Sequence, residues 1–323
     1  MILVTGGAGY IGSHTVKLLR KRGYEVVIFD NLSRGHKEAL PDGVPFEKVD
    51  LLDYEGLYKN IKKYPIEALI HFAAFAYVGE SVENPAMYYR NNVVGSFNLI
   101  NSAKEAGVNK FVFSSTCSVY GNPETIPMSE SDTPAPINPY AKTKLMIENM
   151  LEDYDTSFGS KYVALRYFNA AGDSEDGDIG ESHDPEPHLI PLVLFAALGK
   201  REKVKIYGDD YPTKDGTCIR DYIHVNDLAD AHIRALEYLK SGNNSTVINL
   251  GTGVGYSVRE IVDIASEVTG RKIRADVVAR RPGDPATLIA DNKKAKEVLG
   301  WKPEYDLKRI LETAWKWHSN PKY

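Results

Sequence analysis

Tyr140 and Lys144 are the residues best placed to do chemistry, because they stand four apart directly after Pro139. Proline suits the first turn of a helix, where its missing N–H costs nothing. Residues four apart on a helix share one face, so the phenol and the ammonium are expected to project into the same space. A free phenol titrates near ~10, and an adjacent positive charge favours its anion. The pair therefore suits a tyrosine that acts as a base.

A glycine-rich turn near the N-terminus predicts a bound dinucleotide. Gly6, Gly9 and Gly12 follow the apolar run 1–5 and precede an amphipathic helical stretch. Glycines here allow a tight turn and close approach of the backbone to a pyrophosphate, which the helix N-terminus then faces. The next apolar run ends in Asp30, a carboxylate suited to the ribose hydroxyls and repelling a 2′-phosphate. NAD is therefore favoured over NADP, and the strand–turn–helix–strand order argues against a turn without a ligand.

Length and composition are those of an ordinary globular enzyme. A chain of 323 residues is long enough for one large domain or two modest ones, and its net charge of −5 gives no reason to expect nucleic acid or an anionic membrane as a partner. No stretch approaches the ~20 apolar residues needed to span a bilayer. Cys117 and Cys218 lack metal-ligand spacing, so we expect no disulfide framework and a cytoplasmic location.

Strand-like runs alternate with helix-like segments, which predicts an α/β fold with a Rossmann-type, doubly wound parallel sheet. Strands are expected at 1–5, 26–29, 46–51, 68–74, 110–116 and 162–169, and helices near 53–64 and 85–106. From about residue 170 an acidic, glycine-rich loop is followed by shorter elements, with helices near 189–199, 226–240, 257–269 and 306–318. We expect an NAD-binding Rossmann domain at 1–169 and a smaller, mixed α/β substrate lobe at 170–323, with some segments interleaved.

Ligands of such sheets lie beyond the carboxyl ends of the strands. The residues that close the strands are therefore candidate pocket residues: Ala73, Ala74, Ser114, Ser115, Thr116 and Asn169.

The chain resembles the extended short-chain dehydrogenase/reductase family, and within it the UDP-glucose 4-epimerases. The likeness runs essentially end to end, through the segments 5–12, 29–32, 71–74, 78–82, 89–93, 114–116, 138–144, 166–169, 208–213, 215–225 and 280–284. The cofactor fingerprint is shared by many relatives, whereas the motifs around Arg220 and Arg281 occur in a much smaller group of them. The resemblance also implies a homodimer, in which the helices at about 85–106 and 140–157 pair across a two-fold axis.

What the resemblance implies is interconversion of UDP-galactose and UDP-glucose with no net redox change. Tyr140 would take the proton from the sugar C4 hydroxyl while the hydride passes to tightly held NAD⁺. The 4-keto sugar would then turn over and be reduced again on the opposite face. Thr116 would hydrogen-bond the reacting oxygen and pass the proton, and Lys144 would bind the nicotinamide ribose. The family anchors UDP firmly and holds the hexose loosely, because a tightly fixed sugar could not turn.

The resemblance implies two sets of binding residues. Those matching cofactor contacts are Gly6, Gly9, Tyr10, Ile11, Gly12, Asp30, Asn31, Ser33, Asp50, Leu51, Phe72, Ala73, Ala74, Asn91, Ser114, Tyr140, Lys144 and Phe168. Those matching the UDP-sugar site are Thr116, Asn169, His188, Leu189, Tyr207, Arg220, Arg281 and Asp284. Two arginines suit a diphosphate because the guanidinium fork pairs well with phosphate oxygens. Outside the family frame, each arginine could equally form a surface salt bridge.

Two positions depart from the family pattern. Ala76 stands where relatives often have a lysine near the cofactor, and Leu288 stands at a position that gates the sugar pocket. That gate is a tyrosine in enzymes restricted to UDP-glucose and UDP-galactose, and a smaller residue in those that accept N-acetylated sugars. Leucine lies between the two, so acceptance of UDP-N-acetylhexosamines is a hypothesis. The stretches 75–78 and 114–117 also resemble relatives that act on UDP-pentoses.

Other functions fit the sequence less well. Nucleotide-sugar dehydratases and decarboxylases need an acidic residue just after Thr116, and 117–120 has none. A dinucleotide-sensing regulator would keep the glycine turn but lose the catalytic residues, whereas Thr116, Tyr140 and Lys144 are all present in this chain. A simple dehydrogenase would need an exchangeable cofactor. His188 and His224 have no evident group to orient them, so we expect them to be structural or to contact substrate rather than to act as acid–base groups. The acidic loop 173–186 has no recognisable ligand spacing, so no metal is assigned.

Overall fold

The computed structural model describes residues 1–281 and 283–323, and it confirms the predicted fold class. Pro282, part of the 280–284 motif, lies outside the described residues. A seven-stranded, all-parallel sheet runs in the order β10-β6-β5-β4-β1-β2-β3. Its strands are β1 (Ile2–Thr5), β2 (Val26–Asp30), β3 (Phe46–Lys48), β4 (Ala68–His71), β5 (Lys110–Ser114), β6 (Lys161–Tyr167) and β10 (Thr246–Leu250).

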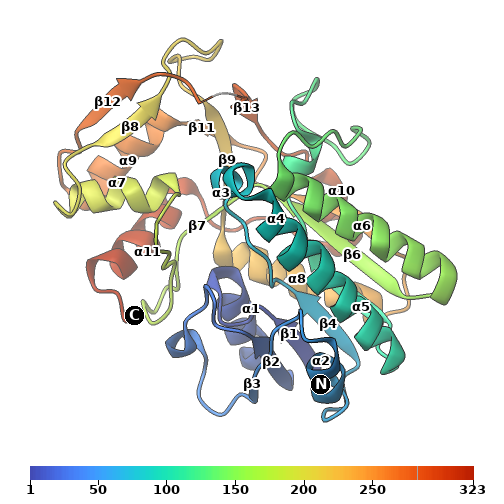
Figure 1. The fold of residues 1–323 in the computed structure, drawn as a ribbon. Coiled ribbons are helices and arrows are strands. Elements are labelled where there is room, and N and C mark those ends of the chain that lie inside the picture. The colour runs from blue at the N-terminus through green and yellow to red at the C-terminus, as the bar shows by residue number, and fades with distance from the viewer. Residues whose placement is uncertain (282) are drawn as a thin grey trace.

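Helices cover both faces of this sheet (Figure 1). One face packs on α1 (Tyr10–Lys21), α8 (Val225–Lys240) and α10 (Lys293–Leu299), the other on α2 (Tyr54–Ile61), α5 (Gly95–Glu105) and α6 (Pro139–Phe158). Successive strand residues point to opposite faces, so Ile2 and Val4 join the first core while Leu3 joins the second. Because both faces are buried, the strands read as continuous apolar runs rather than alternating ones.

A second group of elements lies beyond the carboxyl ends of the strands. β9 (Ile219–His224) pairs with β7 (Asn169–Ala171), β11 (Gly255–Ser257) and β13 (Thr287–Leu288), and β8 (Val204–Tyr207) pairs with β12 (Ala275–Val278). Three helices bury a separate core against them: α7 (Leu189–Ala197), α9 (Val258–Thr269) and α11 (Leu307–Ser319). These helices agree closely with the predicted ranges. No helix in the described part of the chain has the length and apolarity to cross a bilayer.

One feature differs from expectation. The long helix predicted at 85–106 consists of α4 (Pro85–Tyr88), a π-helical turn η2 (Tyr89–Val94) and α5, with α3 (Val78–Glu83) preceding them. The sheet takes its last strand, β10, and the covering helices α8 and α10 from beyond residue 170, where some interleaving of segments was expected. The substrate lobe is thus interrupted by elements of the first sheet, while the boundary at 169/170 stays a prediction.

Candidate active site

Helix α6 places the Tyr140–Lys144 pair at the sheet. Asn138 caps the helix by accepting a hydrogen bond from the Ala141 N–H at 2.9 Å, and Pro139 occupies the first turn, as predicted. Both side chains are buried, with Tyr140 6% and Lys144 3% exposed. The Lys144 ammonium lies 5.9 Å from the centre of the Tyr140 ring. The predicted shared face is therefore present, and it points inward.

Lys144 is held at the end of strand β5. Its Nζ donates to the carbonyl oxygen of Ser114 at 2.7 Å and lies 4.9 Å from the centre of the Phe113 ring. Burial lowers the pKa of Lys144 to about 7, against the opposing effect of Glu148. The lysine is therefore poised between its charged and neutral forms near neutral pH.

Thr116 lies beside Tyr140 and is equally buried, at 6% exposed. Its hydroxyl accepts a hydrogen bond from the Ser118 N–H at 3.2 Å, which begins the short turn η3 (Cys117–Tyr120). Burial raises the pKa of the Tyr140 phenol far above its ordinary value, the neighbouring Tyr167 raises it further, and a hydrogen bond with Thr116 lowers it. The phenol needs additional positive charge before it can act as a base near neutral pH.

The hydroxyls that close strand β5 have separate partners. The Ser114 hydroxyl and the Tyr167 hydroxyl lie 2.8 Å apart. Ser115, in contrast, donates to Glu148 at 2.5 Å, and Glu148 is also bound by Arg166 in a buried ion pair. Ser115 was a candidate pocket residue on its position alone; its side chain serves the buried ion pair instead.

The glycine turn closes tightly around its own backbone. Gly6 has φ +73°, and a Cβ there would stand 2.5 Å from the backbone nitrogen of Ala73. A Cβ on Gly12 would stand 2.1 Å from the carbonyl oxygen of Gly6. Any side chain at either position would force the strand ends and helix α1 apart. The close approach that a pyrophosphate requires is therefore built into the turn.

An open groove with about 610 Å³ of empty space lies at this turn. Predicted cofactor residues form most of its lining: Gly6, Gly9, Asp30, Asn31, Ser33, Asp50, Leu51, Phe72, Ala73, Ala74 and Asn91. The other predicted cofactor residues are not in this lining: Tyr10, Ile11, Gly12, Ser114, Tyr140, Lys144 and Phe168. The groove's position over the turn, and the side chains available in it, fit the adenosine end of a dinucleotide.

Asp30 organises the groove. Its carboxylate accepts hydrogen bonds from the Ala8 N–H at 3.0 Å and the Leu32 N–H at 2.8 Å, and Leu32 has φ +60°. Burial raises the pKa of Asp30, and the two backbone donors lower it. The residue predicted to bind ribose thus also ties the glycine turn to the loop after β2.

Five residues of the groove lining were not among the predicted cofactor residues, and Arg34 is the charged one; the others are Phe29, Gly35, Val49 and Phe75. Arg34 forms an ion pair with Glu80 at 2.6 Å, and its guanidinium carbon lies 4.8 Å from the centre of the Tyr77 ring. Arg34 brings a cation to the lining of the groove, where Ala76 supplies none. The available signal was a basic residue in the same loop as Asp30, which spacing alone does not distinguish from a surface charge.

Four of the predicted UDP-site residues form two pairs with one another. Arg220 forms an ion pair with Asp284, and the Arg281 guanidinium carbon lies 3.9 Å from the centre of the Tyr207 ring. The hydrogen bond from Arg281 lowers the pKa of Tyr207. Separately, Asn169 donates to the Asp221 carbonyl oxygen at 3.0 Å.

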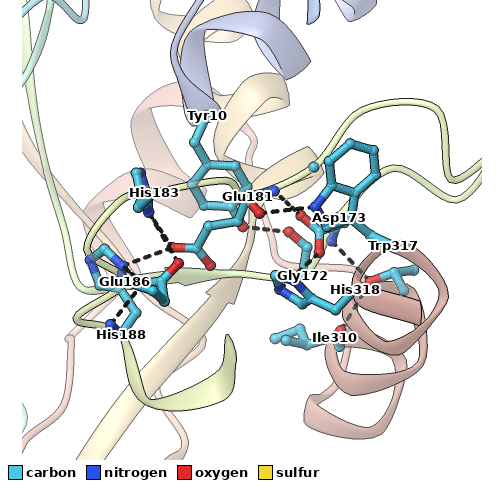
Figure 2. Close-up of polar contacts among 12 residues, drawn as sticks. Tyr10, Gly172, Asp173, Glu181, His183, Glu186, His188, Ile310, Trp317 and His318 are labelled. Carbon is cyan, nitrogen blue, oxygen red and sulfur yellow. Dashed lines mark hydrogen bonds and ion pairs between the residues drawn. The ribbon is translucent and has the colours of Figure 1, made fainter. Parts of the chain in front are cut away.

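His188 and Leu189 stand at the start of helix α7. The His188 ring is directed at Glu181 and Glu186, with Nδ1 2.8 Å from an oxygen of each (Figure 2).

Leu288 lies beside the catalytic region. Strand β13 pairs Leu288 with Arg220 of β9. Leu288 is partly buried against a small core that contains Cys117, Phe168 and Ala290. The predicted gate is thus adjacent both to the turn that follows Thr116 and to a predicted phosphate-binding arginine.

Known proteins resemble this chain over nearly its full length. Residues 2–251 match the NAD dependent epimerase/dehydratase family. A UDP-glucose 4-epimerase from Rhizobium meliloti is 53% identical over 98% of this chain and 97% of its own. The crystal structure of the UDP-glucose 4-epimerase from Brucella ovis in complex with NAD is 51% identical, with a TM-score of 0.95 and 97% of each chain covered. The UDP-Glc/GlcNAc 4-epimerase from Campylobacter jejuni is 44% identical, with a TM-score of 0.87 and 98% of each chain covered.

Proposed function

The chain belongs to the NAD-dependent epimerase/dehydratase family, and from that premise we propose that Thr116, Tyr140 and Lys144 catalyse its reaction. The reaction is the interconversion of UDP-glucose and UDP-galactose at C4, with NAD as cofactor. One observation carries the assignment of residues: Tyr140 and Lys144 are buried on one face of α6, beside Thr116 at the carboxyl end of β5. That edge is where parallel sheets bind their ligands.

Each catalytic residue has a distinct task. NAD, when bound in the groove, would supply a hydride acceptor and donor for C4 of the sugar. Tyr140 accepts the proton of the C4 hydroxyl, and the Thr116 hydroxyl, which hydrogen-bonds the phenol, relays it. Lys144, anchored on the Ser114 carbonyl, holds a proton at Nζ and contributes positive charge near the phenol ring. Burial of all three excludes water from the proton transfer.

The cofactor is proposed to lie along the groove over the glycine turn. Gly6 and Gly9 permit the pyrophosphate to approach the backbone, and Asp30 and Asn31 face the adenosine end. Arg34 adds a cation at that end of the groove. Lys144 is proposed to bind the nicotinamide ribose. The other predicted cofactor contacts outside the groove lining are Tyr10, Ile11, Gly12, Ser114, Tyr140 and Phe168.

UDP is proposed to bind between Arg220 and Arg281, with Asn169, His188, Leu189 and Tyr207 around it. The Arg220–Asp284 pair and the Arg281–Tyr207 stack support this, because both guanidinium groups are fixed before any phosphate arrives. An arginine held in place loses less side-chain freedom on binding a diphosphate.

A second class of substrate, UDP-N-acetylhexosamines, is favoured by Leu288. The leucine side chain is shorter than the tyrosine side chain of the restricted enzymes, and it packs beside Cys117 and Phe168. The leucine therefore takes up less of the pocket than that tyrosine would, which favours acceptance of an N-acetyl group. UDP-pentoses, which are smaller than hexoses, are a further proposed substrate class.

A homodimer is proposed from the surface of the helices at 85–106 and 140–157. Val94, Phe97 and Met146 are between 42% and 47% exposed on these segments, and Phe158, the last residue of α6, is 56% exposed. Apolar side chains gathered on adjacent helices favour burial against a second copy. Light scattering after size-exclusion chromatography should give twice the chain mass, and Phe97→Glu should halve it. We also propose a cytoplasmic location, supported by two free, buried cysteines.

The first experiment is incubation of the purified protein with UDP-galactose and no added NAD, with the sugar followed by proton NMR. Conversion to a mixture with UDP-glucose is expected, because the cofactor is regenerated in each turnover and is retained. A wild-type protein that remains inactive after NAD is supplied would contradict the proposal. The same assay on Tyr140→Phe tests the catalytic assignment separately from the reaction.

A further inference from the structure

Four side chains able to bind a metal ion meet in the loop between β7 and α7. Glu181, His183, Glu186 and His188 each offer one ligand atom, and these atoms lie within 4.8 Å of one another. Figure 2 shows the two carboxylates and two imidazoles converging near the ring of Tyr10. Their spacing in the sequence matches no familiar ligand pattern, and only the folded loop brings them together.

The separations between the donor atoms fit a shared ion. His183 Nδ1 lies 3.3 Å from a Glu181 oxygen and 3.4 Å from a Glu186 oxygen. It is buried and has no hydrogen-bond partner within residues 1–281 and 283–323. Two ligands of a tetrahedral metal, each about 2.0–2.1 Å from the ion, stand about 3.3–3.4 Å apart. His183 therefore sits at ligand spacing rather than at hydrogen-bonding geometry.

The ligands are held in place by the surrounding fold. The Glu181 and Glu186 side chains are 4% and 5% exposed. The Glu181 N–H donates to Asp173 at 2.6 Å, and the Glu181 carbonyl oxygen accepts from the Trp317 indole at 2.9 Å. Two carboxylates buried side by side are costly unless positive charge neutralises them. The fold therefore holds the two buried carboxylates at a fixed position, where a bound cation would stabilise them.

His188 completes the set and leaves it reachable. Its Nδ1 lies 2.8 Å from one oxygen of each carboxylate, so those contacts would lengthen by about half an ångström around a tetrahedral ion. The His188 side chain is 44% exposed, which gives an ion a path from solvent.

The donor types select the class of ion. Magnesium and calcium prefer sites made of oxygen alone, whereas imidazole suits zinc, nickel, cobalt and iron. Two carboxylates and two neutral imidazoles carry a charge of −2, which a divalent cation balances. We propose that Glu181, His183, Glu186 and His188 bind one divalent transition-metal ion of the zinc class per chain.

The ion would join three parts of the molecule and take no part in the reaction. His188 is the cap residue of α7, and the His183 ring packs edge-on against Tyr10 of α1, with ring centres 6.2 Å apart. Glu181 is fixed to Trp317 of α11. Its expected effect is on stability and on the position of the loop, and through His188, which is also proposed to contact UDP, on the binding of substrate rather than on the chemistry at C4.

Metal content is the direct test. The purified protein is analysed by inductively coupled plasma mass spectrometry, stripped with a chelator, and titrated with Zn²⁺ in a calorimeter and with Co²⁺ in the visible range. We expect one equivalent per chain, a saturable Co²⁺ absorption band displaced by Zn²⁺, and a higher melting temperature with metal. Absence of saturable binding by Zn²⁺, Co²⁺ and Ni²⁺ would leave only a cluster of protonated histidines and carboxylates, and would overturn the proposal.

Charge-matched variants separate the site from general electrostatics. Glu186→Gln removes a ligand, and Glu175→Gln removes an exposed carboxylate of the same loop, which pairs with Arg309 instead. Glu186→Gln should weaken Zn²⁺ binding at least about 100-fold, and Glu175→Gln should leave it unchanged. Equal losses in both variants would reject the site. Should Glu186→Gln fail to fold, His188→Ala carries the same test, because its ring is partly exposed.

Discussion

The Lys144 ammonium donates a hydrogen bond to the carbonyl oxygen of Ser114 at 2.7 Å, and so ties helix α6 to the end of strand β5. The proposed catalytic pair is therefore fixed to the strand edge beyond which we propose that the substrate binds. The bond also explains how a lysine can be buried, because one of its donors is satisfied by the backbone. Lys144 thus has a positioning role that holds before any cofactor is bound.

Lys144→Met should change how stability depends on pH. The pKa of Lys144 is about 7 in the folded protein and 10.5 in a free lysine, so between these values the unfolded chain holds a proton that the folded chain lacks. The free energy of unfolding of the wild type should therefore rise with pH across this window, by a few kcal/mol at most. Urea titrations from pH 7 to 10, at equal NAD occupancy, should show a flatter profile in Lys144→Met. The exposed Lys142→Met is the control, and a profile unchanged in Lys144→Met would refute the buried lysine's contribution.

Tyr140→Phe should lower kcat for UDP-galactose by about 10²–10⁴-fold, because it removes the proton acceptor while keeping the ring. Bound NAD, released by heating and measured by absorbance, should stay at the wild-type level. Tyr154→Phe lies on the same helix and outside the site, and it should retain full activity. A Tyr140→Phe variant with more than a tenth of wild-type kcat would require a different base.

Arg220→Lys should raise KM for UDP-galactose about tenfold or more and leave kcat within a few-fold. An ammonium cannot reproduce the two-pronged contact of a guanidinium with a diphosphate, and such a loss affects ground and transition states alike. Arg259→Lys, at an exposed ion pair with Asp209, is the matched control and should not change KM. A fall in kcat alone for Arg220→Lys would place that arginine nearer the reacting sugar than proposed.

Leu288→Tyr should narrow substrate choice. The wild type is expected to turn over UDP-GlcNAc at more than about a thousandth of its rate on UDP-galactose, a discrimination below roughly 4 kcal/mol. The larger side chain beside Cys117 and Phe168 should cut the UDP-GlcNAc rate at least tenfold and leave UDP-galactose within a few-fold. Parallel NMR assays with the two sugars give the ratio. Equal losses on both sugars would show that Leu288 supports the pocket without gating it.

Glu148→Gln should destabilise the fold by about 3–5 kcal/mol, because it leaves the buried Arg166 charge without its partner. Combining it with Arg166→Met should restore part of the loss, since no unpaired charge then remains. The exposed pair Lys293–Glu297, 3.9 Å apart, is the comparison, and Lys293→Ala should cost under about 1 kcal/mol. Urea denaturation measures the free energy of unfolding of all three variants, and similar losses at the two ion pairs would contradict the role of burial.

Local signals in the sequence predicted the elements that carry the chemistry. Helix α6 begins where Asn138 and Pro139 placed it, and β1, β2 and β5 follow their apolar runs. The glycine turn was predictable because the required conformations exclude side chains, as the contacts at Gly6 and Gly12 show. The roles assigned to the individual site residues stay predictions.

Features that depend on tertiary contacts were not predictable in the same way. The π-helical turn η2 follows the apolar pattern of an ordinary helix, and its Asn92 side chain bonds both the Phe75 N–H and the Phe75 carbonyl oxygen. Strand β10 has a local signal, yet nothing local specifies its pairing with β6. Gly180 is explained only by the fold, since a Cβ there would stand 2.3 Å from the buried Trp317 ring. That contact helps to place the loop that carries Glu181.

The return of β10 and α8 to the first sheet has a consequence for how the molecule can be divided. A fragment ending at residue 169 would lack the strand that pairs with β6 and the helix that packs on α1. Without the later segments, Val163, Leu165 and Val16 would be open to water, and α8 and β10 would lose the surface on which they pack. Residues 1–169 are therefore not a transplantable module, and swapping the first sheet between relatives would require junctions on both sides of 225–250 as well as one after residue 169.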